Sequence, residues 1–374
     1  MHLTNFDLDN YLKELETIVN MDSGSSYPEG VAKVADFFIK KYKELGCYTD
    51  KVNLSPRIGP CVRVLTKHTD RFDVLLVGHM DTVFPEGTTL KRPFRIKDRI
   101  AYGPGVVDMK AGLLSAYYVI KEWMSQKNRE GSICLLMNSD EEIGSVYSTP
   151  WIKEHAAKSK VAFVLEPARS DGSFVIERKG TAKFEVIFRG VSAHAGVDPE
   201  KGKSAIVEMA RWILELDELN DYEKGLTLNT GTVTGGTVVN MVANHAVMKL
   251  DTRFKNPEQI EKVESVMNRM IENPMVKGVT ASVKRISYRE PMNPNERTCA
   301  LAAKLERLGK KSGISVKWRP TGGVSDGNGI SSLGIPVIDG FGPVGGNTHN
   351  EGEYLEIDSV YPRIRLLYDI ITTV

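Results

Sequence analysis

A histidine and an aspartate stand two residues apart where the apolar run Val74–Val77 ends, at His79 and Asp81. In an extended strand, side chains two residues apart point to the same face of the sheet. A histidine that binds a metal usually donates its second ring N–H to a carboxylate or a carbonyl, which fixes its orientation. We therefore predict that His79 is a metal ligand and that Asp81 orients it by contacting His79 alone. By itself the pattern is weak, because any strand end can carry it.

A single acid, Asp108, lies in the glycine-rich turn 102–112, just before a predicted helix. Glycine lets the backbone bend closely around a bound ion, and the acid would project from the turn. The alternative is an ordinary helix N-cap. Taken alone, this turn favours the N-cap, so a metal-binding role for Asp108 depends on the segments that follow.

Three consecutive acids, Asp140, Glu141 and Glu142, follow the apolar run 135–137. They repel one another, and the end of an apolar strand is a costly place for them unless cations compensate. Adjacent glutamates can divide the work, one binding a metal while the other moves protons. We predict that Glu142 is a ligand and Glu141 a general base.

Two further candidates complete the set. Glu166 ends the apolar run 161–165, where an exposed loop glutamate is the alternative, and His349 lies in the glycine-flanked loop 345–353. In open α/β sheets, ligands gather beyond the carboxyl ends of the strands. The set therefore has nitrogen and oxygen ligands without sulfur and suits two divalent ions about 3.5 to 4 Å apart, with one carboxylate able to bridge them. Its members are His79, Asp108, Glu142, Glu166 and His349.

The elements that must position these residues alternate along the chain. Apolar spacing predicts helices at 7–21, 29–46 and 110–125 and strands at 60–66, 73–78, 132–138 and 161–165, which is typical of an α/β sheet with covered faces. The loop Ser23–Ser26 is taken as a plain turn. From residue 184 the predicted order changes to strand, helix, strand, strand, helix, strand, as in a ferredoxin-like sandwich. A helix at 297–312 and a strand at 335–338 then return to the first sheet.

Size and composition are those of an ordinary protein with two domains. The chain has 374 residues, 49 Lys and Arg against 48 Asp and Glu, and a formal charge of +1. This balance favours neither nucleic acid nor an anionic membrane as a partner. The first residues, Met1–Asp7, lack the pattern of a signal peptide, no later run is long enough to span a bilayer, and four cysteines are scattered, so we expect a cytoplasmic protein with reduced thiols.

The quoted segments together resemble the dinuclear zinc exopeptidase and deacylase family of acetylornithine deacetylase, succinyl-diaminopimelate desuccinylase and glutamate carboxypeptidase, and are most similar to the last. The resemblance covers nearly the whole chain. It implies an α/β fold with a zinc-exopeptidase-like mixed sheet flanked by helices and an inserted α+β ferredoxin-like dimerisation (lid) domain. The catalytic domain would comprise 1–178 and 291–374, and the insert 179–290.

The resemblance also implies roles for the ligands. Asp108 would bridge two ions, zinc or alternatively cobalt or manganese. His79 and Glu166 would complete the shell of one ion, and Glu142 and His349 that of the other.

Within the insert, the resemblance assigns residues to the substrate. His194, in the segment 189–196, would stabilise the oxyanion and, in a homodimer built through the insert, reach the neighbouring subunit's site. Asn240 and Arg253 would clamp a free carboxylate, since arginine pairs with carboxylates in a bidentate way. The sequence departs from the family shortly after Asn240, where relatives commonly have a proline and this chain has Val242-Ala243-Asn244. Arg289 would favour a C-terminal glutamate, with an exposed linker arginine as the alternative. The loop 321–328 is similar to the family's glycine-rich substrate loop.

These assignments predict hydrolysis of an amide bond next to a free carboxylate. A water between the ions would lose a proton to Glu141, the resulting hydroxide would attack the amide, and Glu141 would pass its proton to the leaving amine. The leading prediction is a carboxypeptidase that releases C-terminal glutamate from peptides or N-acyl amino acids. The alternatives are an N-acyl amino acid deacylase and a non-catalytic metal-binding protein, against which Glu141 argues. A nucleotide site at Gly202–Ser204 is rejected, because the phosphate loop requires glycine where the chain has Val197.

Overall fold

The chain folds into two compact units in a computed structural model that describes residues 6–127 and 129–374. The larger unit comprises residues up to Glu177 together with Pro294–Pro320 and Ser325–Val374, and the smaller unit comprises Arg178–Asn293 and Thr321–Val324. Most of the segment Met1–Asp7, on which the prediction about a signal peptide depends, lies outside the described residues. Among the helices that the structure describes, none is long and apolar enough to cross a bilayer.

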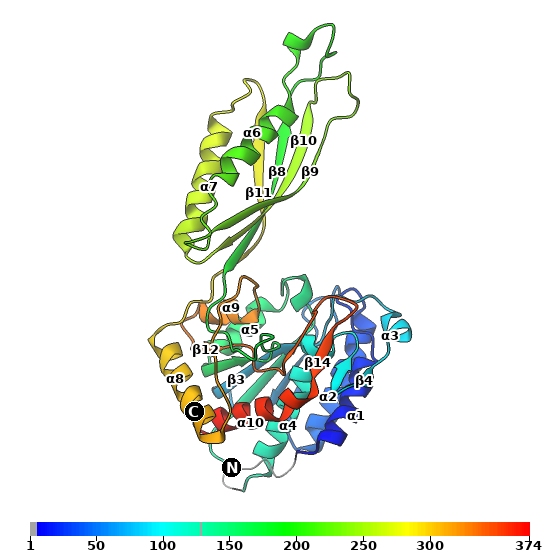
Figure 1. Cartoon of the computed structure of the whole chain (residues 1–374), viewed down its shortest axis with the longest axis vertical. Coiled ribbons are helices and arrows are strands. Elements are labelled where there is room, and N and C mark those ends of the chain that lie inside the picture. The colour runs from blue at the N-terminus through cyan, green and yellow to red at the C-terminus, as the bar shows by residue number, and fades with distance from the viewer. Residues whose placement is uncertain (1–5, 128) are drawn as a thin grey trace. The chain divides into compact units, whose positions relative to one another are not determined.

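A six-stranded mixed sheet forms the centre of the larger unit (Figure 1). The β6–β3–β7–β12 part is parallel, and β1 and β2 add antiparallel strands at one edge. Because β3 and β6 are buried on both faces, they read as continuous apolar runs. In spatial order the strands are β1 (Tyr48–Val52), β2 (Cys61–Leu65), β6 (Ile133–Asn138), β3 (Phe72–His79), β7 (Ser159–Val164) and β12 (Val337–Ile338).

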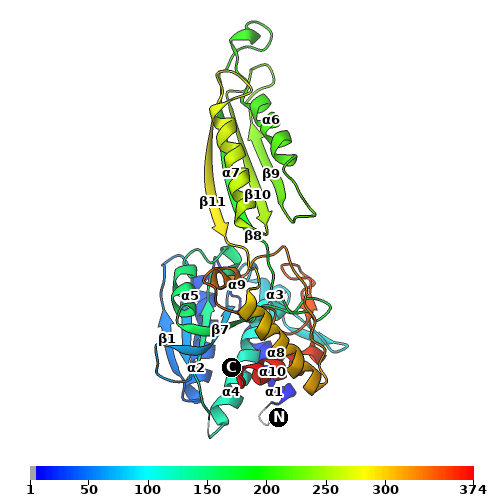
Figure 2. The ribbon, with the colours of Figure 1, turned by 90° about the vertical axis from the view of Figure 1, so that its left-hand side faces the viewer.

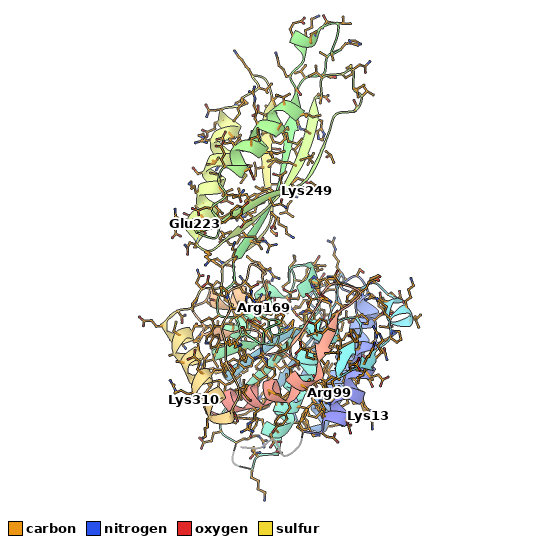
Figure 3. The ribbon with its side chains drawn as sticks, in the orientation of Figure 1. Lys13, Arg99, Arg169, Glu223, Lys249 and Lys310 are labelled. Atoms are coloured by element: carbon orange, nitrogen blue, oxygen red, sulfur yellow. The ribbon has the colours of Figure 1, made fainter. Side chains whose placement is uncertain are left out.

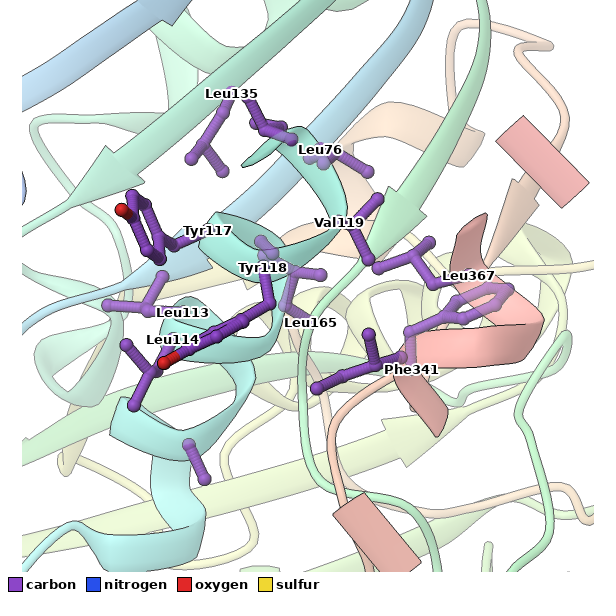
Figure 4. Close-up of a cluster of buried hydrophobic side chains, with 14 of the residues drawn as sticks. Leu76, Leu113, Leu114, Tyr117, Tyr118, Val119, Leu135, Leu165, Phe341 and Leu367 are labelled. Atoms are coloured by element: carbon purple, nitrogen blue, oxygen red, sulfur yellow. The ribbon is translucent and has the colours of Figure 1, made fainter. Parts of the chain in front are cut away.

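Helices cover both faces of this sheet. On one face, the almost entirely buried α4 (Ala111–Ser125) packs with Leu76 and Leu135 of the sheet and with Leu367 of α10 (Val360–Ile371), as Figure 4 shows. α1 (Leu8–Val19), α2 (Pro28–Glu44) and α8 (Glu296–Ser312) add to the same core. On β7, α5 (Thr149–Ala156) and α9 (Asp326–Ser331) pack together. α3 (Thr88–Lys91) lies outside this core.

A second, small sheet belongs to the larger unit. It has the order β13–β14–β5–β4, with strands of only two or three residues: β4 (Arg95–Lys97), β5 (Ile100–Tyr102), β13 (Gly345–Gly346) and β14 (Tyr354–Glu356). Its antiparallel register places Tyr354 opposite Tyr102. The sheet therefore joins two segments that lie about 250 residues apart in the chain.

The smaller unit is a ferredoxin-like sandwich with its own apolar core. Its elements are β8 (Gly180–Arg189), α6 (Ala205–Asp217), β9 (Thr227–Gly235), β10 (His245–Phe254), α7 (Pro257–Glu272) and β11 (Thr280–Arg289). The antiparallel sheet has the order β11–β8–β10–β9, and both helices lie on one of its faces (Figure 2). The other face carries polar side chains such as the exposed Lys249, labelled in Figure 3.

The predicted fold class is confirmed: a mixed sheet flanked by helices is accompanied by an α+β sandwich of the predicted element order. The sequence predictions omitted β1, the helices α3, α5, α9 and α10, and the small sheet. Strands of two or three residues carry too little periodicity to be recognised, and their pairing is set by partners distant in the chain.

Candidate metal centre

Three predicted ligands follow neighbouring parallel strands of the central sheet. His79 is the last residue of β3 and lies opposite Asn138, the last residue of β6. Glu142 follows in a short helical turn after β6, and Glu166 follows β7 by two residues. Because the carboxyl ends of parallel strands meet at one edge, these three side chains converge.

The other two predicted ligands come from the side of the small sheet. Asp108 lies in the turn between β5 and α4, and His349 lies in the loop between β13 and β14. Two sheets thus supply the cluster, three side chains from the central sheet and two from the small one.

Distances group the ligands around the carboxylate of Asp108. Its Oδ1 is 3.3 Å from His79 Nε2, and its Oδ2 is 3.2 Å from His349 Nε2. Glu166 Oε1 lies 3.7 Å from His79 Nε2, and Glu142 Oε2 lies 3.0 Å from His349 Nε2. Each oxygen of Asp108 therefore faces a different histidine, and each histidine faces a further glutamate.

These separations suit divalent ions. Two ligand atoms that each lie about 2.1 Å from one tetrahedral zinc ion are about 3.4 Å apart, close to the nitrogen–oxygen distances in the cluster. The donors are imidazole and carboxylate, which zinc, cobalt and manganese all accept. The residues present therefore fit a two-ion site in which Asp108 serves both ions.

Ligand atoms within 4.8 Å of one another also form two groups that cut across this division: His79, Asp108 and Glu142 in one, and His79, Glu141 and Glu166 in the other. The division by Asp108 oxygens is favoured by the distances, because each of these oxygens lies within 3.3 Å of a different histidine. The second group places Glu141 beside His79 and Glu166, within the cluster rather than on the surface. The assignment of each role stays a prediction.

The electrostatics of the cluster indicate a demand for positive charge. Burial, followed by repulsion from Asp108, raises the pKa of Glu166 well above its usual value. Burial would lower the pKa of His79, but hydrogen bonds with Asp108 and Asp81 raise it well above normal. Bonds to Asp108 and Glu142 raise the pKa of His349 to about 10. In the metal-free protein, these raised pKa values favour the protonated forms of Glu166, His79 and His349, so protons occupy the positions where cations would bind.

Asp81 does more than predicted. The Nδ1 of His79 lies 2.9 Å from the carbonyl oxygen of Asp81 and 3.4 Å from its carboxylate Oδ1. The same carboxylate accepts the backbone N–H groups of Glu141 and Glu142, each at 3.2 Å, and the Ser25 hydroxyl at 2.7 Å. The prediction that Asp81 contacts His79 alone is therefore wrong. Asp81 ties β3 to the segment that carries the predicted base.

Ser25 was missed because the loop Ser23–Ser26 reads as a turn. The backbone of Ser25 also donates to the carbonyl of Thr82, so this loop pairs with the chain just beyond Asp81. A short polar loop in the sequence gives no signal of such a distant partner.

Asp140, the remaining acid of the run 140–142, points away from the metal cluster. Asp140 is buried, and its carboxylate accepts the N–H groups of Tyr147 and Ser148. Nearby, Asp326 accepts from Ser145 and Asn138, at the end of β6. These bonds brace both sides of the segment that carries Glu141 and Glu142.

In the smaller unit, His194 and Asn240 lie together at one end of the sheet. His194 forms a bridge with Met241, and the N–H of Ala195 donates to the carbonyl of Asn240 at 2.9 Å. This is the end where β10 begins, at His245, which lies opposite Arg189 of β8.

Arg253 and Arg289 lie at the opposite end of the same sheet. Both are opposite Thr181 of β8, one on each side of it, so all three side chains share a face. Arg253 pairs with Asp251 at 2.8 Å. Burial lowers the pKa of Lys179, and the nearby charges of Lys255 and Arg253 lower it further.

Asn240 and Arg253 do not form one clamp within a chain. His245 and Arg253 are eight residue steps apart along β10, which corresponds to roughly 27 Å in an antiparallel strand. The prediction that both hold one carboxylate is therefore wrong for residues of a single chain. The family resemblance implied a shared site, but the intervening strand is fully extended.

A model of peptidase family M20/M25/M40 matches residues 75–373, a range that contains every predicted ligand. The chain belongs to this family. Membership of the M20 family establishes a hydrolase of metallopeptidase type, in which a dinuclear zinc centre is typical. Carboxypeptidase G2 of Pseudomonas sp. (strain RS-16) is 29% identical over 369 residues, covering 96% of this chain and 89% of the relative. Succinyl-diaminopimelate desuccinylase of Dechloromonas aromatica is 25% identical, covering 89% of this chain and 90% of the relative.

Solved structures show the same M20 fold. Aminopeptidase PepT of Bacillus cereus superposes with a TM-score of 0.83 at 24% identity, covering 98% of both chains. The metallo-carboxypeptidase Sso-CP2 of Sulfolobus solfataricus gives 0.76 at 18% identity, covering 97% of this chain and 99% of the other. These likenesses support the fold only, and the substrate has to be inferred from the site.

Metal binding should release protons. Because the pKa of His349 is about 10 in the metal-free protein, its imidazole is protonated at pH 7 and must lose that proton to bind an ion. Affinity for Zn²⁺ should therefore rise with pH between 6 and 8, by about tenfold per pH unit for each proton displaced. Calorimetric titration in buffers of different ionisation enthalpy measures the release. On binding Zn²⁺, the His349→Ala protein should release fewer protons than the wild type. An affinity of the wild type for Zn²⁺ that is independent of pH would contradict the prediction.

Proposed function

We propose that this protein is a metal-dependent carboxypeptidase that releases C-terminal glutamate from peptides or N-acyl amino acids. The observation that carries the proposal is the carboxylate of Asp108 placed between His79 and His349, with Glu141 in the same cluster. Similarity to carboxypeptidase G2 along nearly the whole chain supports the peptidase reading of that cluster.

In the proposed mechanism, His79, Asp108, Glu142, Glu166 and His349 hold two divalent ions. Such ions lower the pKa of water to about 7 and polarise the substrate carbonyl. Glu141 accepts the proton of the attacking water and later donates it to the leaving amine. Asp81 holds the backbone of Glu141 in place, because its carboxylate accepts that residue's N–H. His194 donates to the developing oxyanion.

Arg253 and Arg289 support an acidic substrate. They lie on β10 and β11, the two strands on either side of Thr181 in β8. Two strand spacings of about 4.8 Å therefore separate their backbones. A C-terminal glutamate carries two carboxylates, and each guanidinium can bind one of them in a bidentate way. We assign both arginines to substrate binding on this ground.

The alternative is a deacylase that acts on N-acyl amino acids. It is supported by the similarity to succinyl-diaminopimelate desuccinylase, at 25% identity over 352 residues. The same metal cluster serves both reactions, so the difference lies in which side of the amide bond the protein selects.

Two adjacent glutamates provide the first test. Glu141→Gln should retain both ions and lose turnover by about 10²- to 10⁴-fold, since an amide cannot accept the proton. Glu142→Gln, the matched control, should instead weaken the binding of one ion. Metal content is measured by elemental analysis and kcat by amide hydrolysis. An active, metal-loaded Glu141→Gln protein would rule out the assignment.

Substrate choice provides the second test. Dipeptides with C-terminal glutamate should be cleaved with higher kcat/KM than N-acetyl or N-succinyl amino acids. Arg289→Leu should raise KM for C-terminal glutamate by about 10- to 100-fold, because a charged hydrogen bond contributes about 1.5 to 3 kcal/mol. The same substitution should raise KM less for dipeptides with C-terminal alanine. Arg285→Leu, on the same strand but paired with Glu264, is the control. Preference for succinyl substrates would favour the deacylase.

We further propose a homodimer formed through the smaller unit. β9 is an edge strand, and α6 packs beside it. Leu214 of α6 is 69% exposed, and Val207 and Val233 on the same two elements are also exposed. An edge strand with apolar neighbours is a ready site for another chain. A dimer would also explain why His194 and Arg253 lie at opposite ends of one sheet: each would serve a different site.

The dimer can be tested by mass and by complementation. Leu214→Glu should shift the sedimentation of the protein to that of a monomer, whereas Leu90→Glu, at an 88% exposed position of the larger unit, should not. Mixing inactive His194→Ala with inactive Glu141→Gln should restore activity if His194 acts in the partner's site. A wild-type monomer with full activity would refute the proposal.

Location in the cytoplasm is part of the proposal. Its support is the state of the thiols: Cys47, Cys61, Cys134 and Cys299 are all free, and the first three are buried. Fractionation of the producing cells would check it.

A further inference from the structure

The buried carboxylate of Glu353 has no part in the proposed reaction, yet both its oxygens are engaged. The side chain is 1% exposed. Oε2 accepts the N–H of Gly105 at 2.9 Å, and Oε1 accepts those of Val107 at 2.9 Å and Asp108 at 3.0 Å. Gly105 has a φ of 71°, in the left-handed region that favours glycine, which lets these N–H groups converge on one anion.

Glu353 also belongs to the loop that carries His349. The N–H of Glu353 donates to Asn350 at 3.2 Å, and the side chain of Asn347 donates to the carbonyl of Gly352 at 3.2 Å, so residues 347–353 form a compact turn. The side chain of His349 is 52% exposed, whereas that of His79 is 1% exposed. Packing therefore contributes less to the placement of His349 than to that of His79.

We infer that Glu353 is a positioning residue that fastens the His349 loop to the Asp108 turn and thereby sets the geometry of the ion bound by His349, Glu142 and Asp108. The inference rests on the proposed two-ion site. The other ion would share Asp108 but take its remaining ligands from His79, the last residue of β3, and from Glu166, which follows β7; neither of these two lies in the loop. Loss of Glu353 should thus affect one ion more than the other.

Glutamine at this position tests the inference. Its amide offers one oxygen and one N–H₂ group, and the latter would face backbone N–H donors in a buried space. At least one of the three N–H groups then loses its acceptor, and the loop moves away from the turn. Glu351→Gln is the matched control, because Glu351 lies in the same loop and is exposed.

Metal-free wild type, Glu353→Gln and Glu351→Gln are titrated with Zn²⁺ by calorimetry and with Co²⁺ by visible absorption. Wild type and Glu351→Gln should each bind two ions, and the affinity at each site should be the same in the two proteins. Glu353→Gln should retain one site and weaken the other by about 10- to 100-fold, the usual effect of removing a group that supports a ligand. The ratio of the two affinities is the decisive quantity, because general destabilisation would lower both together.

Three outcomes separate the inference from the proposed function. Equal loss at both sites, or wild-type affinity at both, in Glu353→Gln would overturn the role of Glu353. A wild-type protein that binds fewer than two ions would overturn the proposed two-ion centre instead. If circular dichroism shows that Glu353→Gln does not fold, Glu353→Asp is tested in its place, because its shorter side chain cannot reach all three N–H groups. Wild-type affinity of Glu353→Asp at the site formed by His349, Glu142 and Asp108 would equally overturn the inference.

Discussion

The carboxylate of Asp108 is the constraint on which the cluster depends. Its two oxygens face the Nε2 atoms of His79 and His349 at nearly equal distances of 3.3 and 3.2 Å. Burying a carboxylate is costly unless it is paired, and here two histidines lower the pKa of Asp108 below its usual range although burial opposes this. Because one histidine ends β3 of the central sheet and the other lies in the loop between β13 and β14 of the small sheet, the position of this one side chain requires both sheets to form correctly.

Backbone N–H groups orient the acids of the site. Asp81 accepts from Glu141 and Glu142, and Asp140 accepts from Tyr147 and Ser148. Charged acceptors make stronger hydrogen bonds than neutral ones, so each such carboxylate fixes a loop as well as itself. Buried acids around the cluster thus hold the loops in place, while neighbouring acids converge on the two histidines. This division explains how an edge so rich in negative charge keeps a single arrangement.

Sequence patterns were sufficient for most of the long elements, though not for α10, and for the approximate place of the predicted ligands. The apolar runs before His79, Glu141 and Glu166 are strands buried on both faces, and their shared edge follows from parallel pairing. The ferredoxin-like order was recognisable for the same reason. What escaped depends on non-local contacts: the short strands around Asp108 and His349, the hydroxyl of Ser25 on Asp81, and the three N–H groups on Glu353. The Asn240 and Arg253 pair failed because spacing in sequence does not reveal that an extended strand separates them.

The two units have separate hydrophobic cores, one under the central sheet and one between α6, α7 and the four-stranded sheet. Side chains on the helix-free face of that sheet, including Arg253 and Arg289, make no demand on the packing beneath it. The acids and histidines of the cluster belong to the larger unit, whose core is separate from that of the smaller one. A substitution on that face should therefore change the surface chemistry of the smaller unit while both units keep their fold.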